Sequence, residues 1–428
     1  MKNKFFALIT LFCCIIAASA ESLTVKVTVK NDCDYARKDE PVALQLKDVK
    51  RLKFDVRYAS VALNGKSLRC QLDDMDEDFT TDEVFWLTDL KAHEAQTFEV
   101  TLSDQIPATR VPGDFDLDKA AEADPRIYSV LQIRDKKDLH PNVLKVEAPA
   151  ESNIFNDIYM HGITIESELV GYRIYFDERQ NIDLYGKKLQ RLELATTQFY
   201  TSAEQLADDY GTDVLWAGKA IGCGSFKRYM DGEPTNWLGT LQKVRGERIV
   251  TRGPLRTVVE VYDLGIKNDG SLYNVRQYYS LVAGHRDLKV DVLFEGNAAG
   301  QEFCTGVQKV GVTATDSVRM GHTPQGILRA DGITASWGCD YPDMGKKQLW
   351  GPEAIGMAVY MPAKYVKSSK ESDINYLYVV TPNDGAIHYW TSFCCAKENV
   401  GYKNARQWFD SMDEWKVLCD NPIKISVK

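Results

Sequence analysis

The sequence predicts an all-β protein, and three features of the chain support this prediction. Short segments in which apolar and polar residues alternate follow one another from Leu23 to Leu102, and longer ones follow after Ile127. Asn, Asp, Gly and Pro separate these segments, as is typical of turns. Helical periodicity is confined to residues 201–211 and 404–420. Long strands without alternating helices exclude a parallel α/β sheet.

The pattern changes along the chain and predicts two globular units. Residues 21–105 hold short strands at the spacing of a small immunoglobulin-like β-sandwich. Residues 106–126 are rich in Pro, Asp and Ala and lack periodicity, so we expect a linker there. Residues 127–428 hold long strands, which predict two large antiparallel sheets packed face to face.

The first 20 residues have the features of a cleaved secretory signal peptide. Lys2 and Lys4 precede an apolar stretch, and Ala18, Ser19 and Ala20 form a small-residue cleavage site. That stretch is too short for a membrane span, and no later segment is apolar enough to cross a bilayer. We therefore expect an exported, periplasmic protein without a membrane span.

Charge and missing motifs exclude several classes of function. The formal net charge of −9 argues against a nucleic-acid partner, which requires a basic face. The chain lacks the motifs of a phosphate loop, a dinucleotide-binding turn, a serine-hydrolase elbow and a zinc protease. The cysteines form no C-x-x-C pair, and the acidic run at residues 73–78 lacks the glycine and terminal glutamate of a calcium loop. We therefore expect no cofactor and no metal, and a solvated loop at residues 73–78.

The segment "GYRIYFD", residues 171–177, contains an unusual strand. Because strand side chains alternate between faces, Tyr172, Ile174 and Phe176 share one face, and Arg173, Tyr175 and Asp177 share the other. On a solvent-facing edge, the polar face would show ordinary cross-strand pairing. In a two-sheet fold, a polar strip that contains an aromatic residue also fits a substrate cleft, which is the interpretation we prefer.

Other candidate residues lie in segments that mix polar and aromatic side chains. His161 and Glu166 precede the strand, and Lys187 follows it. The segment "GTDVLWAGKAIGCGSF" supplies Trp216 and Lys219, and "AIHYWTSFCC" supplies His388 and Trp390. We expect Glu166, Asp177, Lys219, Trp216, His388 and Trp390 to bind substrate, with the tryptophans as candidates to stack on sugar rings.

Several ordered motifs resemble DUF4861, a family of exported bacterial proteins of unknown function that are encoded in polysaccharide-utilisation loci. They are "HG…E…GYRIYFDERQNIDLYGK", "DVLWAGKAIGCGSF", "GPLRTVVEVYDLG", "ASWGCDYP" and a closing "EW", within about residues 125–428. The resemblance implies a galactose-mutarotase-like β-supersandwich and a role in uronate processing, including dehydration of a non-reducing-end uronate in ulvan-type oligosaccharides. It also implies that His161, Arg173, Tyr175 and Lys187 are site residues. His388 departs from the tyrosine expected at that position.

The predicted function is β-elimination on uronate-containing oligosaccharides, by a dehydratase or a lyase. Removal of the C5 proton requires a base and neutralisation of the carboxylate, for which Arg173 and Lys187 are suited as fixed cations. Tyr175 and His161 are then the acid–base partners, with cations lowering the pKa of the phenol. Two alternatives stay open. They are a glycosidase that uses Glu166 with Asp177 or Asp183, and a non-catalytic sugar-binding protein.

Overall fold

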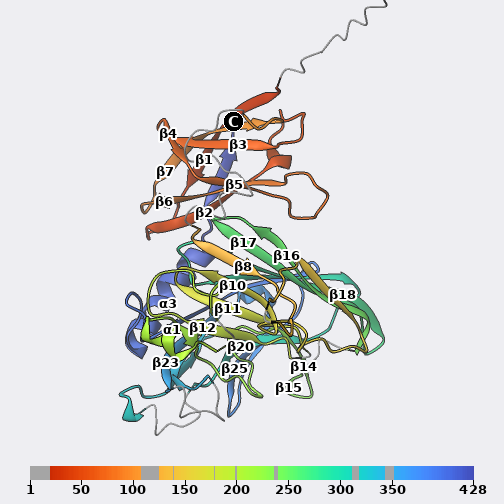
Figure 1. Cartoon of the computed structure of the whole chain (residues 1–428), viewed down its shortest axis with the longest axis vertical. Helices are drawn as coiled ribbons and strands as arrows, with labels where there is room; N and C mark the ends of the chain where they lie inside the picture. Colours follow the sequence, from red (N-terminus) through yellow and green to blue (C-terminus); the bar gives the residue numbers. More distant parts are fainter. Residues whose placement is uncertain are drawn as a thin grey trace, which may run out of the picture.

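The structure is a computed structural model that describes residues 20–107, 125–137, 139–177, 179–197, 200–235, 240–310, 318–342 and 351–428. A small β-sandwich sits at one end of a larger unit of sheets (Figure 1). The all-β fold class is therefore confirmed. The predicted signal peptide (1–20) and linker (106–126) lie almost entirely outside the described residues, so both stay predictions.

The small sandwich consists of two antiparallel sheets whose inward residues form one core. Alternation along "LTVKVTVK" places Val25, Val27 and Val29 inside, where they pack with Phe98 and Trp86. The first sheet has the order β27 (Lys424–Val427), β1 (Ser22–Lys30), β7 (Ala95–Ser103), β3 (Tyr58–Leu63) and β4 (Lys66–Leu68). The second has the order β2 (Arg37–Gln45), β6 (Glu83–Leu90) and β5 (Cys70–Asp73), and a short 3-10 helix, η1 (Leu46–Asp48), follows β2.

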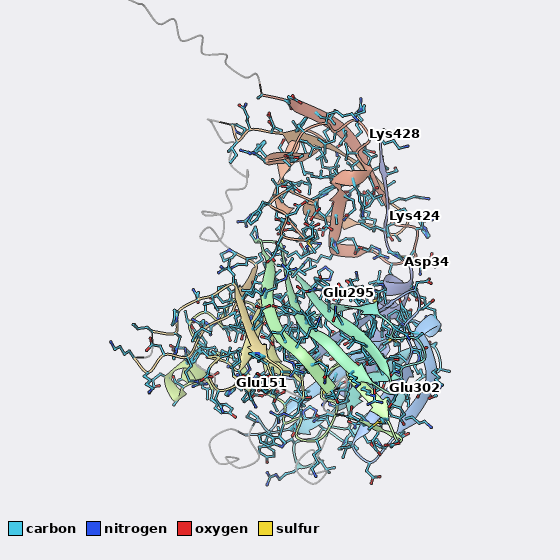
Figure 2. The ribbon with its side chains drawn as sticks, turned by 90° about the vertical axis from the view of Figure 1, so that its right-hand side faces the viewer. Asp34, Glu151, Glu295, Glu302, Lys424 and Lys428 are labelled. Carbon is cyan, nitrogen blue, oxygen red and sulfur yellow. The ribbon has the colours of Figure 1, made fainter. Side chains whose placement is uncertain are left out.

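The last strand of the chain belongs to this small sandwich. β27 pairs antiparallel with β1, with Val427 opposite Val27 and Lys424 opposite Lys30. Figure 1 shows the blue C-terminal strand among the orange ones, and Figure 2 labels Lys424 and Lys428 beside them. We had assigned all of residues 127–428 to the large unit, so the assignment of residues 424–427 was wrong. A four-residue strand carries no pattern that identifies its sheet, and here it covers the edge of β1.

The large unit contains a nine-stranded sheet and two five-stranded sheets. The nine-stranded sheet has the order β21 (Gln325–Leu328), β22 (Ile333–Asp340), β23 (Glu353–Tyr360), β26 (Ala386–Cys395), β19 (Leu288–Gly296), β18 (Ser271–Val282), β17 (Arg256–Asn268), β16 (Thr240–Arg252) and β9 (Lys145–Pro149). One five-stranded sheet, the site sheet, has the order β13 (Thr212–Asp213), β12 (Ile182–Gly186), β11 (Val170–Tyr175), β10 (Gly162–Ser167) and β8 (Ile127–Val130). The other has the order β15 (Glu233–Pro234), β14 (Lys227–Met230), β20 (Phe303–Gln308), β25 (Asn375–Val380) and β24 (Val366–Glu371), and a 3-10 helix, η3 (Ala363–Tyr365), precedes β24.

The shorter sheets pack against one face of the nine-stranded sheet. One apolar cluster joins them and includes Tyr172 and Ile174 from β11, Val259 from β17, and Ile387 and Tyr389 from β26. This arrangement is the predicted supersandwich. Because Tyr172 and Ile174 face this core, Arg173 and Tyr175 project from the opposite face of the site sheet, as the alternation predicted.

Both predicted helical pieces form helices. α1 (Ala203–Ala207) begins with a capping box in which the Ser202 hydroxyl accepts from the Gln205 N–H. α3 (Ala405–Asp420) is capped by Asn404 and buries Trp408 and Met412 against β22 and β23. No helix in the described part of the chain combines the length and the apolarity that a membrane crossing requires.

Candidate functional site

The site sheet brings together polar residues that are far apart in the sequence. In the β10–β11–β12 ladder, Thr164, Arg173 and Asp183 lie in one cross-strand row. The edge strand β13 adds Asp213, which pairs with Tyr185 on the same face. The hairpin between β11 and β12 fixes this register, since residue pairs that face each other across a ladder project to the same side.

Arg173 is committed to ion pairs inside the protein. Its Nε donates to Asp183 Oδ2 at 2.7 Å and its Nη2 donates to Asp213 Oδ2 at 2.8 Å. The side chain is 1% exposed. Burial raises the pKa of Asp213 well above its usual value, and the charge of Asp183 adds to this. We expected Arg173 to neutralise a substrate carboxylate, but in the structure it forms ion pairs with Asp183 and Asp213.

Lys187 and Glu166 form a second buried ion pair. The ammonium of Lys187 donates to the Glu166 carboxylate, to Ser167 O at 2.6 Å and to Arg191 O at 2.8 Å, which uses all three of its donors. The Glu166 carboxylate also accepts from the backbone N–H groups of Glu193 and Leu194. Neither side chain reaches the surface, so the structure does not support the catalytic role predicted for Lys187 or the binding role predicted for Glu166.

Tyr175 lies at the end of β11, where it is partly exposed. Its hydroxyl donates to Asp183 Oδ2 at 2.9 Å. Burial, together with the negative charge of Asp183, raises the pKa of Tyr175 well above 10. The direction is opposite to the lowered pKa that we expected from nearby cations. Tyr175 therefore stays protonated at neutral pH and is a proton donor rather than a base.

His161 stands on a strained turn just before β10. The φ angles of Met160 and His161 are +54° and +62°, a left-handed conformation that side-chain-bearing residues rarely adopt. The next residue, Gly162, has no room for a Cβ, which would lie 1.7 Å from the Ile174 carbonyl oxygen. Such strain concentrates at functional sites, where the surrounding structure maintains it.

The environment of His161 favours the neutral imidazole. Its ring stacks on Phe155 with a centroid distance of 3.9 Å, and its Nδ1 lies 3.0 Å from the Phe155 carbonyl oxygen. Because a carbonyl only accepts, Nδ1 carries the proton and the basic lone pair is on Nε2. Burial lowers the pKa of His161, and the positive charges of Arg134 and Arg173 act in the same direction.

His161 and Tyr175 are neighbours against one aromatic wall. Their ring centroids are 6.1 Å apart with the planes at 80°, and Phe155 contacts Tyr175 edge-on at 5.7 Å. Arg134, on the exposed rim, lies over the Tyr159 ring at 5.7 Å. The structure thus places a neutral imidazole base beside a protonated phenol, with a guanidinium nearby.

A cavity of about 190 Å³ lies beside segments that precede and follow this pair in the sequence, but neither His161 nor Tyr175 is among the residues that line it. It is lined by Asn153, two residues before Phe155, and by Phe176 and Asp177, which follow Tyr175. Glu151, labelled in Figure 2, and Arg245 also line it. The Asp177 carboxylate accepts from Arg179 Nε at 2.7 Å and from the backbone N–H groups of Arg179 and Gln180. Asp177 therefore fixes the β11–β12 turn and borders the cavity. The acceptor of the Tyr175 hydroxyl is Asp183, not Asp177.

The remaining predicted binding residues lie on other parts of the large unit. Trp216 is 42% exposed on the loop after β13, and its backbone N–H donates to Asp340 Oδ2 at 3.3 Å. Lys219 is exposed on the same loop. His388 and Trp390 project from β26 on the face of the nine-stranded sheet that is turned away from the core. There His388 Nδ1 contacts Asp291 Oδ1 at 2.6 Å, and Trp390 stacks on Tyr360 at 5.8 Å. The two sheets separate His388 and Trp390 from His161 and Tyr175, so one cleft does not contain all four.

Several residues at the site were not among our predicted site residues. Asp213 lies in the segment "GTDVLWAGKAIGCGSF" but had no predicted role. Phe155 precedes the polar segment that holds His161, and nothing in "LQIRDKK" marks Arg134. Glu247 carried a usable signal. In "VRGERIV", Glu247 lies two residues before the core residue Ile249, so on a strand both side chains point to the same face. The pattern therefore predicts a carboxyl group inside the sandwich.

Residues 74–78 of the acidic run form a partly to fully exposed loop, as expected, whereas Asp73 ends β5 and is buried. The side-chain oxygens of Asp74, Asp76 and Asp78 lie within 4.8 Å of one another. Asp74 accepts from the N–H groups of Glu77 and Phe79, and Asp78 accepts from the N–H of Thr80. These bonds shape the loop itself and do not point to a ligand.

Comparison with solved structures finds loose overlaps with proteins of very different sequence. An alpha-mannosidase from Enterococcus faecalis is 8% identical, with a TM-score of 0.43, and the match covers 95% of this chain and 46% of that chain. The chain thus spans about half the length of that protein. A protein from Klebsiella pneumoniae assigned as an aldose 1-epimerase is 7% identical, with a TM-score of 0.31, covering 69% of this chain and 97% of that chain. These overlaps are too loose to assign an activity.

No curated protein matches the sequence. A family model, described as a domain of unknown function (DUF4861), matches residues 29–425. The match is longer than the resemblance seen in residues 125–428 and takes in most of the small sandwich. Both ends of the matched range lie in one sheet, because β27 pairs with β1. The chain belongs to the DUF4861 family.

Proposed function

We propose that this protein is an exported carbohydrate-active lyase that performs β-elimination on uronate-containing oligosaccharides. His161 is the base and Tyr175 is the acid. One observation supports this most strongly: a strained turn holds a neutral imidazole 6.1 Å, between ring centroids, from a phenol that stays protonated. Environments that push the pKa values of two neighbouring groups apart are typical of acid–base sites.

The reaction requires two proton transfers, one to His161 and one from Tyr175. His161 Nε2 removes the C5 proton, which is acidic because it lies beside the carboxylate. The electrons of the C5–H bond form a C4–C5 double bond as the C4–O bond breaks. Tyr175 gives up its hydrogen bond to Asp183 and donates its proton to the departing oxygen, since an alkoxide or hydroxide is more basic than a phenolate. If that oxygen carries a sugar the protein is a lyase, and if it is a hydroxyl the protein is a dehydratase.

The substrate carboxylate requires a cation, and the structure changes which residue we assign. Arg173 and Lys187 are buried in ion pairs. Arg134 is exposed, and its charge acts on His161. We assign Arg134 to the substrate carboxylate because a guanidinium can hold a carboxylate at two points.

Mass spectrometry of the products tests the proposal. The protein is incubated with uronate-rich oligosaccharides, and three results are distinguished. Loss of water or cleavage without water, each with a new ultraviolet absorbance from the conjugated double bond, supports β-elimination. Cleavage with uptake of water identifies a glycosidase. Binding without product identifies a sugar-binding protein. Either of these two results contradicts the proposal.

A pair of tyrosine variants links any activity to the site. Tyr175→Phe removes the proposed acid, whereas Tyr185→Phe removes a buried hydroxyl on the next strand that donates to Gly211 O. We expect only the first to lose turnover. Equal losses in both variants would indicate that the sheet, rather than the proposed acid, was disturbed.

A further inference from the structure

The nine-stranded sheet contributes one side chain to the turn that carries His161. Glu247, on β16, is fully buried between the two sheets. Its Oε2 accepts the backbone N–H of Ile163 at 2.9 Å, and Ile163 is the second residue after His161. A carboxyl group of the opposite sheet is therefore bonded to the segment that sets the position of the imidazole.

The turn needs this support because its own conformation is strained. Met160 and His161 both have left-handed backbone conformations. The His161 N–H donates to Ile158 O at 3.2 Å, and the His161 carbonyl accepts from Phe176 N at 2.8 Å. The bond to Glu247 follows immediately and fixes the start of β10.

Glu247 has the surroundings of a neutral acid. Burial raises its pKa well above the usual value and outweighs the opposing effects of the Ile163 N–H bond and the charge of Arg245, while the charges of Asp177 and Asp263 add to the rise. Arg245 is itself bonded to Asp263 at 2.7 Å, and Tyr279 faces Glu247 from β18. Glu247 Oε1 has no hydrogen-bond partner among the described residues. In a neutral acid, Oε2 would be the carbonyl-type acceptor for Ile163 and Oε1 would carry the proton.

We propose that Glu247, as a neutral carboxylic acid, is a positioning residue that holds the His161 turn and keeps the imidazole packed against Phe155. The inference builds on the function proposed above, because it assigns Glu247 to the proposed base. It concerns the orientation of His161, and that orientation is measurable without any substrate.

The test is an NMR titration of His161 in the full-length protein, with the signal assigned by its loss in His161→Ala. Glu247→Gln keeps a neutral carbonyl acceptor for the Ile163 N–H, whereas Glu247→Met removes it. We expect the pKa of His161 to stay below 6.5 in the wild type and in Glu247→Gln, and to rise toward 6.5 in Glu247→Met as the ring becomes solvated. If Glu247→Met does not fold, Glu247→Asp withdraws the acceptor by one methylene and should give the same shift.

Glu260→Gln is the matched control, because Glu260 is equally buried but lies on the outer face of the sheet, paired with Arg248 and Arg276.

Turnover measurements then separate this inference from the proposed function. On a confirmed substrate, Glu247→Met should lower kcat by about 10- to 100-fold with little change in KM, and Glu247→Gln should restore it. An unchanged pKa of His161 in Glu247→Met and Glu247→Asp overturns the inference. So does a Glu247→Gln variant as perturbed as Glu247→Met, since that means the ionised carboxylate is required. A shifted pKa of His161 without turnover of any uronate in the wild type supports the positioning and contradicts the proposed function alone.

Discussion

Tyr175 donates its hydroxyl proton to Asp183 Oδ2 at 2.9 Å, and this bond connects the candidate site to the ion pairs of the fold. The same carboxylate oxygen accepts from Arg173 Nε. Arg173 therefore orients Asp183, and Asp183 orients the phenol. The polar face of β11 thus has a buried ion-paired residue, Arg173, and a partly exposed residue, Tyr175, to which we assign a function.

Arg173→Met should destabilise the protein. The change leaves Asp183 and Asp213 buried without their cation, and the loss of one partner from a buried ion pair costs about 3–5 kcal/mol of unfolding free energy. Denaturant unfolding measures this. Arg179→Met is the control, because Arg179 is 37% exposed and, among the described residues, pairs with the turn residue Asp177 alone, so it should cost about 1 kcal/mol or less. An unchanged stability in Arg173→Met would return Arg173 to the role of substrate ligand.

Lys187 and Glu166 should behave as one buried unit. Lys187→Met leaves the Glu166 carboxylate without a counter-charge and should cost about 3–5 kcal/mol. The double variant Lys187→Met/Glu166→Gln should recover part of that loss, because it removes both charges. A double-mutant cycle in urea measures the coupling. Additive losses would show that the two side chains do not interact as the structure has them.

The pH profile of kcat/KM should be broad, with its acidic limb at lower pH and its alkaline limb at higher pH than unperturbed His and Tyr side chains would give. His161 must be neutral to act as the base, and its pKa is below 6.5, so the acidic limb should fall below pH 6.5. Tyr175 must be protonated to act as the acid, and its pKa is above 10, so activity should persist to about pH 10. A decline that begins near neutral pH on the alkaline side would contradict Tyr175 as the acid.

His285 should make stability pH-dependent at the contact between the small sandwich and the large unit. Its Nε2 contacts the Asp39 carbonyl oxygen at 2.9 Å, and its Nδ1 contacts Asp287 at 3.4 Å. Burial lowers the pKa of His285, but the bond to Asp287 outweighs this and raises it to about 9. A raised pKa means that the contribution is fully present below pH 6.5 and is lost as the pH rises through about 9. Relative to His285→Gln, the wild type should lose unfolding free energy between those values, and parallel curves would contradict the assignment.

Local pattern was enough to predict the strands and the faces of β11. Alternation separated Tyr172 and Ile174 from Arg173 and Tyr175, because the pleat alone sets that division. Both helices followed from their helical periodicity, and the structure caps them with Ser202 and Asn404. His161 and Tyr175 could be selected because an imidazole and a phenol stood in an unusual polar segment.

Sheet order and ion pairing could not be predicted in the same way. His388 and Trp390 have the composition of a sugar site, yet β26 places them on the far face of the nine-stranded sheet. Arg173 and Lys187 look like free cations in the sequence, and their partners become visible only when the ladder and the segment after β12 are in place. The position of β27 depends on a contact across almost the whole chain.

The most direct test of the central claim is the turnover of Tyr175→Phe on an oligosaccharide that the wild type converts to an unsaturated product. The substitution keeps the ring against Phe155 and removes only the hydroxyl, so folding should be nearly unchanged. We predict a loss of about 10²- to 10⁴-fold in kcat, the usual effect of removing a positioned acid. We also predict that adding His161→Ala lowers kcat by much less than the product of the two single effects. Near-normal turnover by Tyr175→Phe would contradict the account and leave the β11 strand as a well-paired structural element.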